Sequence, residues 1–180
     1  SILKDTINLD EVLVKATRVD EKAPFVRSNI TKEEIESRNL GQDIPILLNF
    51  LPNVVSTSYA GNGIGYTGIR VRGSDATRVN VTINGIPLND SESHGVFWVN
   101  LPDFASSTQS MQLQRGVGSS TNGAGAFGAS LSLSTNGIAE NAFGELGFSG
   151  GSFNTLKANL QFGSGIIKGK GKWKSEFSGR

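Results

Sequence analysis

The chain has 180 residues, enough for one domain or for one domain with part of another, and its formal net charge is only +1. With this near-neutral balance no strong electrostatic field points to nucleic acid or to an acidic surface as partner, and the absence of cysteine excludes disulfides and thiolate metal sites. Charged residues make up 18% of the chain, which has 23 glycines; this composition favours strands and turns over a helical bundle.

The first 28 residues are weakly patterned and contain one short extended candidate, residues 9–16, which precedes the helix breaker Pro24. No apolar run in the chain approaches the roughly 20 residues of a membrane helix. Since no secretory signal is present either, we expect a mature or excised segment of a longer precursor.

Two short helices are predicted next. Thr31 and Glu34 form a capping box that starts the first helix, and Gly41 is its expected end. Asp43 is the predicted N-cap of the second helix, with Pro45 in its first turn. The apolar face expected for this second helix, before Pro52 ends it, consists of Ile46, Leu47, Phe50 and Leu51.

The middle of the chain has the pattern of short strands and loops. A glycine-rich loop is predicted at residues 56–68, and β-branched residues predict strands at Ile69–Arg72 and Val79–Ile83. The Asn84-Gly85 pair that follows predicts a tight hairpin turn into Ile86.

A polar loop that ends in aromatic residues is predicted at residues 89–100. Strands are predicted at Met111–Arg115 and Leu131–Leu133, and a glycine- and serine-rich segment, residues 116–128, lies between them.

After residue 141 the pattern changes to three amphipathic strands in which apolar and polar residues alternate. Their apolar positions are Gly144, Leu146 and Phe148, then Leu156, Ala158, Leu160 and Phe162, and then Trp173 and Phe177. Two interpretations stay open: strands that span a membrane as part of a barrel, or a solvated antiparallel sheet with one buried face. Three strands cannot close a barrel, so the first interpretation requires a larger protein.

Five segments in this order resemble the plug of TonB-dependent receptors. They are LDEVLVKATR at 9–18, IPILLNFLPNVV at 44–55, GIRVRG at 68–73, RVNVTINGIPLND at 78–90 and MQLQRGVGSSTNGAGAFGASLSLST at 111–135. The first segment has the position of a Ton box and is most similar to receptors of Bacteroidetes-type bacteria. The fourth has asparagine where the family more often has aspartate.

The resemblance implies an α+β plug domain, a small mixed β-sheet with short helices, lodged in a 22-stranded transmembrane β-barrel. It divides the chain into a periplasmic segment (1–16) with the Ton box (9–16), a plug (17–136) and the start of an incomplete barrel of about three strands (137–180). The implied location is the cell outer membrane of a Gram-negative bacterium, with the plug in the barrel lumen and the N-terminus in the periplasm.

The implied function is receptor-mediated, TonB-coupled import of a scarce nutrient of the siderophore, haem, cobalamin, glycan or peptide class. The expected partners are TonB with its inner-membrane energising complex, the nutrient ligand and outer-membrane lipid, and a surface lipoprotein is left open. No nucleic acid, no cofactor and no enzymatic activity are expected. The alternative from another class is a soluble β-rich ligand-binding or adhesion module.

The resemblance also assigns site residues in three groups. The TonB-binding segment is Glu11, Val12, Leu13, Val14 and Lys15, whose backbone can pair with an exposed sheet edge. The ligand-contacting loops, residues 56–67 and 89–100, carry Tyr59, Asn62, Tyr66, His94, Phe97 and Trp98. The arginines expected to anchor the plug to acidic residues of the barrel wall are Arg70, Arg72 and Arg115.

Each group has a simpler alternative. The N-terminal segment is then a disordered tail without contacts, and the arginines are solvated surface residues. For Phe97 and Trp98 the alternative is packing inside the domain.

Two motifs suggest other chemistry but lack the context for it. Residues 63–68 match G-x-G-x-x-G, yet a β-branched segment follows where a dinucleotide site requires a helix. Asp90, Glu92 and His94 alternate in one loop and have the chemistry of metal ligands, but three ligands in one loop rarely hold a metal. No catalytic residue and no metal ligand is therefore assigned.

Overall fold

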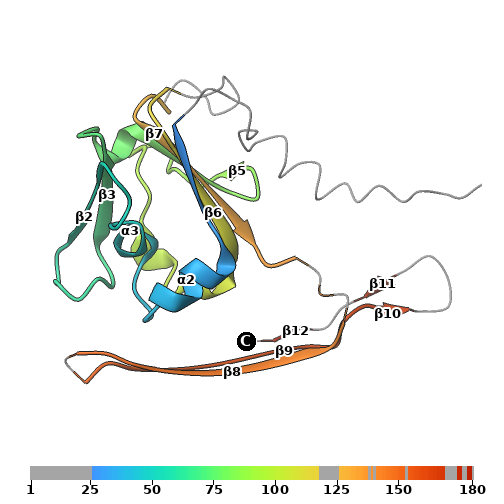
Figure 1. Ribbon diagram of the computed structural model, residues 1–180. Helices are drawn as coiled ribbons and strands as arrows, with labels where there is room; N and C mark the ends of the chain where they lie inside the picture. The colour runs from blue at the N-terminus through green and yellow to red at the C-terminus, as the bar shows by residue number, and fades with distance from the viewer. Residues whose placement is uncertain are drawn as a thin grey trace, which may run out of the picture. The chain divides into compact units, whose positions relative to one another are not determined.

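The computed structural model describes residues 26–117, 126–137, 139, 141–152, 154–168, 174–175 and 178–179 (Figure 1). The chain forms two compact units that divide between Thr135 and Asn136. The TonB-binding residues predicted from the sequence, Glu11, Val12, Leu13, Val14 and Lys15, lie outside the described residues, as do Trp173 and Phe177. Within the described ranges no helix is long and apolar enough to cross a membrane.

A five-stranded sheet forms the centre of the first unit. Its strands are β1 (Arg27–Ile30), β4 (Val79–Ile83), β5 (Ile86–Pro87), β6 (Thr108–Arg115) and β7 (Ala129–Thr135). They lie in the order β1-β6-β7-β4-β5, with β4 and β7 parallel and the other neighbours antiparallel. The small mixed sheet expected from the sequence is therefore confirmed.

The two faces of this sheet differ sharply in chemistry. On one face Leu113 pairs with Leu131 across β6 and β7, and both side chains are fully buried in the core. On the other face Gln114 pairs with Ser130, again in the same two strands. The Nε2 atom of Gln114 and the Oγ atoms of Ser130 and Ser134 are buried without a hydrogen-bond partner in the described part of the chain. The sheet is thus apolar on its core side and polar on the other.

The turn between β4 and β5 forms as predicted. Ile83 pairs with Ile86, and the two residues between them have positive φ angles, 50° for Asn84 and 84° for Gly85. These angles define the tight turn that joins twisted antiparallel strands.

The first helix, α2 (Lys32–Arg38), begins at the predicted cap. The Thr31 N–H donates to Glu34 Oε2 at 3.0 Å, and the Glu34 N–H donates to Thr31 Oγ1 at 3.5 Å. Ile35 is the buried residue of the helix. The chain leaves the helix at Asn39, two residues before the predicted end, because the Asn39 side chain donates to Ser106 Oγ and to Asp103 Oδ1.

This capping box gives a stability prediction. Replacing Thr31 with alanine is expected to lower the free energy of unfolding by about 1 kcal/mol, because the Glu34 N–H loses its acceptor. Urea denaturation of the 180-residue chain measures the change. Thr31→Ser keeps the hydroxyl and should stay near the parent value; an equal loss in both variants would show that the cap contributes nothing.

The second helix, α3 (Ile44–Leu47), is shorter than predicted. It starts after Asp43 with Pro45 in its first turn, as expected, but ends at Leu47 and continues as turns. Its apolar face differs accordingly: Leu48 is fully buried, whereas the Phe50 side chain is 44% exposed and lies under the Arg38 guanidinium at 3.9 Å.

A β-hairpin occupies much of the region predicted as a glycine-rich loop. Its strands, β2 (Val54–Ser58) and β3 (Thr67–Val71), pair antiparallel from Val54↔Val71 to Ser58↔Thr67. The loop is therefore limited to residues 59–66, and the predicted range was too wide because β-pairing of polar residues leaves little signal. Figure 1 shows α3 between this hairpin and the sheet.

Short 3-10 helices complete the first unit. They are η1 (Ala76–Arg78), η2 (Trp98–Asn100) and η3 (Phe104–Ser107). One core joins the sheet, α2, α3, the hairpin and η2, since buried residues of all of them belong to a single cluster.

The described part of the second unit contains five strands: β8 (Phe143–Gly150), β9 (Leu156–Gly163), β10 (Ile167–Lys168), β11 (Lys174–Ser175) and β12 (Ser178–Gly179). The first two predicted alternating strands correspond to β8 and β9. The third was predicted as one strand, but two short strands lie there, β11 paired with β10 and β12 paired with β9. β8 and β9 pair antiparallel over their whole length, with Leu146 opposite Leu160. Apolar side chains such as Leu146 and Phe148 are mostly exposed, while Glu145 and Ser149 on the other face are half-buried.

Candidate functional site

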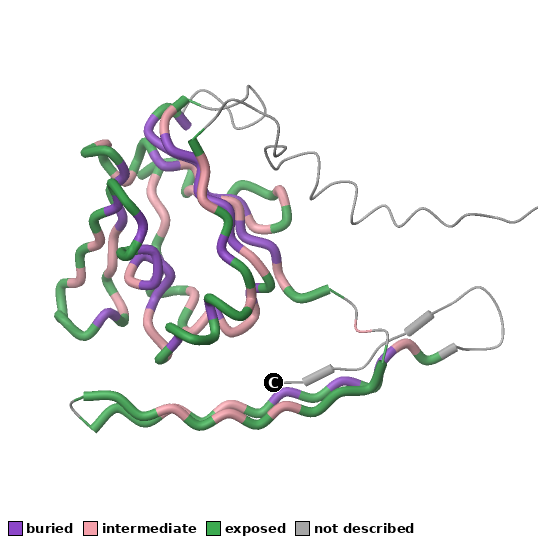
Figure 2. The backbone as a smooth tube through the Cα atoms, in the orientation of Figure 1, coloured by how far each residue is buried: buried purple, intermediate pink, exposed green. Residues whose placement is uncertain are grey.

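The end of the β2–β3 hairpin presents two tyrosines as a pair. The Tyr59 N–H donates to the Tyr66 carbonyl at 3.1 Å, directly beyond the last strand pair Ser58↔Thr67. Tyr59 and Tyr66 are therefore cross-strand neighbours whose side chains leave the hairpin on the same side. Their side chains are 93% and 65% exposed, and Figure 2 shows the tip of the hairpin as largely exposed.

Glycines allow the loop between these tyrosines to turn tightly. Gly61, Gly63 and Gly65 have φ angles of 75°, 80° and 99°, which other residues adopt with strain. This geometry explains the G-x-G-x-x-G match: its first glycine folds the loop, and β3 follows where a dinucleotide site would need a helix.

The same loop is fastened to the start of α3 by Asp43. The Gly65 N–H and the Thr67 hydroxyl both donate to Asp43 Oδ2, at 3.0 and 2.7 Å, and the Asp43 N–H donates to the Gly63 carbonyl at 2.9 Å. Sequence reasoning identified Asp43 only as an N-cap, but its carboxylate makes no cap hydrogen bond. No local signal distinguishes these two uses of an aspartate that precedes a helix.

Asn62 lies in this loop and is exposed, and its side chain shapes the loop itself. Asn62 Oδ1 accepts from the Ile64 N–H at 3.0 Å, a local turn that aspartate and asparagine commonly make. The structure thus places Tyr59, Asn62 and Tyr66 together in one short, hydrogen-bonded loop.

The second predicted ligand loop, residues 89–100, is organised by two polar side chains. Asn89 Oδ1 accepts from the Val81 N–H, and Asn89 Nδ2 donates to the Val79 and His94 carbonyls, which fixes the loop along β4. Asp90 Oδ2 accepts from the Ser93 N–H at 2.7 Å and from its hydroxyl at 2.8 Å. These two bonds hold the pKa of the Asp90 carboxyl below its usual value.

Of the three site residues predicted in this loop, two are accessible. His94 is exposed with a φ of 56°, and the Phe97 side chain is 52% exposed. Trp98 is only 3% exposed and belongs to the core, so it cannot contact a ligand from outside. The alternative interpretation, packing inside the domain, therefore describes Trp98, because η2 turns it inward while its neighbour Phe97 stays at the surface.

The Asp90 carboxylate of this loop is engaged in the turn itself. Asp90 Oδ2 also accepts from the Glu92 N–H at 3.1 Å. In the ranges that the structure describes, no group of three or more histidine, aspartate or glutamate side chains is placed to hold a metal ion.

The three predicted anchoring arginines have different surroundings. Arg115 is buried, and its guanidinium donates to the Pro52 carbonyl at 2.9 Å and to Ser28 Oγ at 3.0 Å. Arg70 and Arg72 are exposed. The sequence assigned one role to all three, but the buried contacts of Arg115 lie inside the first unit.

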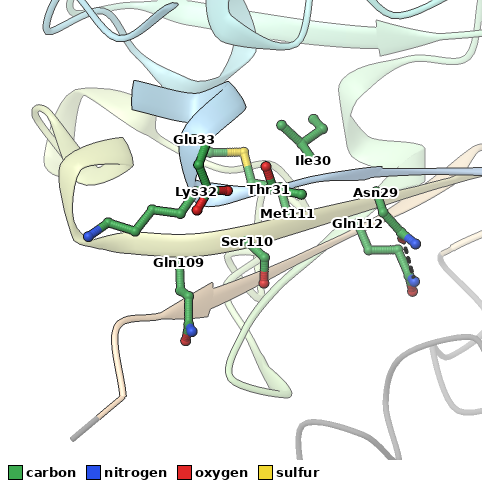
Figure 3. A pocket seen from close by; sticks show the side chains of 9 residues that line it. All are labelled: Asn29, Ile30, Thr31, Lys32, Glu33, Gln109, Ser110, Met111 and Gln112. Carbon is green, nitrogen blue, oxygen red and sulfur yellow. Dashed lines mark hydrogen bonds between the residues drawn. The ribbon is translucent and has the colours of Figure 1, made fainter. Parts of the chain in front are cut away.

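An open cleft of about 350 Å³ lies where β1 meets α2 (Figure 3). Its polar lining includes Asn29 and Gln112, joined by a hydrogen bond of 2.9 Å. Lys32 at its rim forms an ion pair of 3.2 Å with Glu36. The cleft contains none of the residues predicted to bind a ligand, and it is shallow and mixed in character.

Comparison with known proteins identifies the family to which the first unit belongs. Residues 19–130, more than half of the chain, match the family model of the TonB-dependent Receptor Plug Domain. A search of curated protein sequences gave no match.

Solved structures with the same fold include receptors described as uptake or outer-membrane receptors. FyuA, the ferric yersiniabactin uptake receptor of Yersinia pestis, is 16% identical, with a TM-score of 0.57 over 78% of this chain and 21% of that one. FauA, the alcaligin outer-membrane receptor of Bordetella pertussis, is 17% identical, with a TM-score of 0.62 over 79% of this chain and 24% of that one.

The ferripyoverdine receptor of the Pseudomonas aeruginosa outer membrane is 15% identical, with a TM-score of 0.62 over 82% of this chain and 19% of that one. This chain thus spans about a fifth of the length of these structures. At these identities the likeness concerns the fold, and the family model supplies the assignment. The chain belongs to the TonB-dependent receptor plug domain family.

Proposed function

We propose that this chain gates an outer-membrane receptor that imports a scarce nutrient, with ferric siderophores as the leading ligand class. The observation that carries the proposal is the plug match over residues 19–130, in a fold shared with siderophore receptors. Neither this match nor these receptors suggests enzymatic chemistry, and the proposed role requires none.

The second unit supports a barrel that continues beyond this chain. β8 and β9 form an eight-residue antiparallel ladder whose apolar side chains lie on the exposed face. That arrangement suits strands with lipid outside and a polar lumen inside. We therefore assign 1–16 to the periplasmic segment, 17–136 to the plug and 137–180 to the first barrel strands.

Ligand contact is proposed for the two accessible loops. Tyr59 and Tyr66 offer two exposed phenol rings in a loop held by hydrogen bonds, and such rings combine apolar area with a polar tip. Asn62, His94 and Phe97 are the further candidates, all of them exposed. Trp98 is removed from this set because it is buried.

Energy coupling is proposed for residues 11–15, which would pair with TonB by strand addition. The first described strand after them, β1, supports this role because it lies at the edge of the sheet and, among the described residues, pairs only with β6. A pull on the N-terminal segment would reach an edge of the plug rather than its centre. The inner-membrane complex that energises TonB supplies the work, so the plug itself needs no nucleotide.

Anchoring to the barrel wall is proposed for Arg70 and Arg72, whose side chains are exposed on and directly after β3. A guanidinium can bind a carboxylate of the wall through two parallel hydrogen bonds. Arg115, in contrast, uses its terminal nitrogens within the plug.

Deleting residues 9–16 from the full-length receptor tests this function. We expect the variant to lose capture by the periplasmic domain of TonB and to take up radioactive iron only at the level of cells that lack TonB. Binding of ferric siderophore to the cell surface should remain, because the loops are untouched.

The matched control is deletion of residues 1–8, an N-terminal segment of the same length outside the proposed Ton box. This control should retain TonB capture and uptake. If deleting 9–16 leaves both unchanged, the coupling mechanism is wrong. The alternative, a soluble binding or adhesion module, would be favoured if the protein also failed to fractionate with the outer membrane.

A further inference from the structure

The Asp43 carboxylate is buried in an unusual way. Its residue is 2% exposed, and among the residues that the structure describes no lysine or arginine forms an ion pair with it. Burying a carboxylate without a cation costs free energy, so hydrogen bonds must offset that cost. The side chain makes no capping hydrogen bond to its own helix, α3.

The hydrogen bonds of the Asp43 side chain go instead to the tyrosine-bearing loop and to Thr67, the first residue of β3. Gly65 N–H and Thr67 Oγ1 both donate to the single oxygen Oδ2, at 3.0 and 2.7 Å. Bonds to an ionised acceptor are about twice as strong as those between neutral groups. The carboxylate therefore binds the loop where it enters β3.

A second contact fixes the other side of the loop. The Asp43 N–H donates to the Gly63 carbonyl at 2.9 Å, and Gly63 lies so close to α3 that an added Cβ would be 3.1 Å from Ile46 Cγ1. The loop is thus held at its middle by the backbone of Asp43 and at its end by the side chain.

We propose that Asp43 is a positioning residue for the ligand-contacting loop, an inference that rests on the function proposed above for Tyr59 and Tyr66. Asp43 is buried and does not touch the ligand. It holds residues 63–67 in one conformation, which fixes the Tyr59–Tyr66 pair across the hairpin. A loop ordered before binding loses less conformational entropy when the ligand binds, so its affinity for the ligand is higher.

Hydrogen–deuterium exchange of the full-length protein tests this positioning without any knowledge of the ligand. In Asp43→Ala, amides of residues 63–67 should exchange roughly tenfold or more faster, because the Gly65 N–H loses a charged acceptor. Peptides from β6 and β7 should exchange as in the parent protein. Asp43→Asn should restore slow exchange, because both side-chain bonds fall on one oxygen and an amide carbonyl can accept both.

Asp75→Ala is the matched control, since Asp75 also precedes a short helix and accepts from a backbone N–H, that of Thr77, at 2.9 Å. It should leave exchange of residues 63–67 unchanged. The proposal is overturned if Asp43→Ala exchanges at the parent rate in the loop, or if β6 and β7 lose protection equally. If residues 63–67 exchange as fast in Asp43→Asn as in Asp43→Ala, the Oδ2 atom is not the acceptor that holds the loop.

Uptake of radioactive iron by iron-starved cells distinguishes the positioning role of Asp43 from the proposed ligand-contacting role of the loop. We expect Asp43→Ala to reduce uptake about tenfold and Asp43→Asn to preserve it, parallel to the exchange results. If the loop is released in the alanine variant while uptake stays at the parent level, positioning stands and the ligand-contacting role of the loop is overturned.

Discussion

Replacing Leu131 with alanine is expected to lower the free energy of unfolding of the 180-residue chain by about 2–5 kcal/mol. Leu131 is fully buried in β7, between Leu113 on β6 and Val81 on β4. Both neighbours are themselves buried in regular strands and cannot collapse into the space that the missing side chain leaves. Urea denaturation followed by circular dichroism measures the loss.

The adjacent Ser132 provides the control, because it lies on the same strand with its side chain on the opposite face. Ser132 pairs with Gln112 on the polar side of the sheet. Ser132→Ala should change the free energy of unfolding by no more than about 1 kcal/mol. Equal losses in the two variants would contradict the assignment of the core to the Leu131 face.

The parts of the fold that the sequence predicted are those that depend on near neighbours. The capping box of Thr31 and Glu34 involves groups three residues apart, and the Asn84-Gly85 turn involves two adjacent residues with positive φ. Strand β4 also agrees with the prediction, since its β-branched residues favour an extended backbone wherever it packs.

The length of α3 could not be predicted because distant contacts end this helix. The chain must turn after Leu48 so that the Asn53 carbonyl can accept from the Arg72 N–H at 2.8 Å, across the start of the hairpin. Phe50 fits the helical apolar pattern but lies at the surface under Arg38. Periodicity alone does not show which apolar residue meets the core.

In the candidate site, too, features that depend on distant contacts could not be predicted from the sequence. An aromatic pair in a loop signals either ligand contact or packing, and only the three-dimensional arrangement separates exposed Phe97 from buried Trp98. Asp43 was recognised as the residue before a helix, but its bonds to Gly65 and Thr67 span more than 20 residues. No single-sequence pattern encodes such a contact.

The second large loss of stability is expected when Arg115 is replaced. Arg115→Ala should lower the free energy of unfolding by about 2–4 kcal/mol, measured by urea denaturation of the same chain. The guanidinium bridges Ser28 on β1 and the Pro52 carbonyl in the turn after α3, so its removal leaves both acceptors without this donor. The arginine Nε has no partner in the described residues, which lowers the net gain but leaves the bridge intact.

Arg72 is the matched control, since it too precedes a glycine in an Arg-Gly motif. Its side chain is exposed, so Arg72→Ala should change the free energy of unfolding by less than about 0.5 kcal/mol. In the full-length receptor we expect the opposite ranking for a different property: Arg72→Ala should weaken retention of the plug in the barrel more than Arg115→Ala does. Equal destabilisation of the isolated chain by both variants would contradict this distinction, which rests on the burial of Arg115 and on its two guanidinium hydrogen bonds.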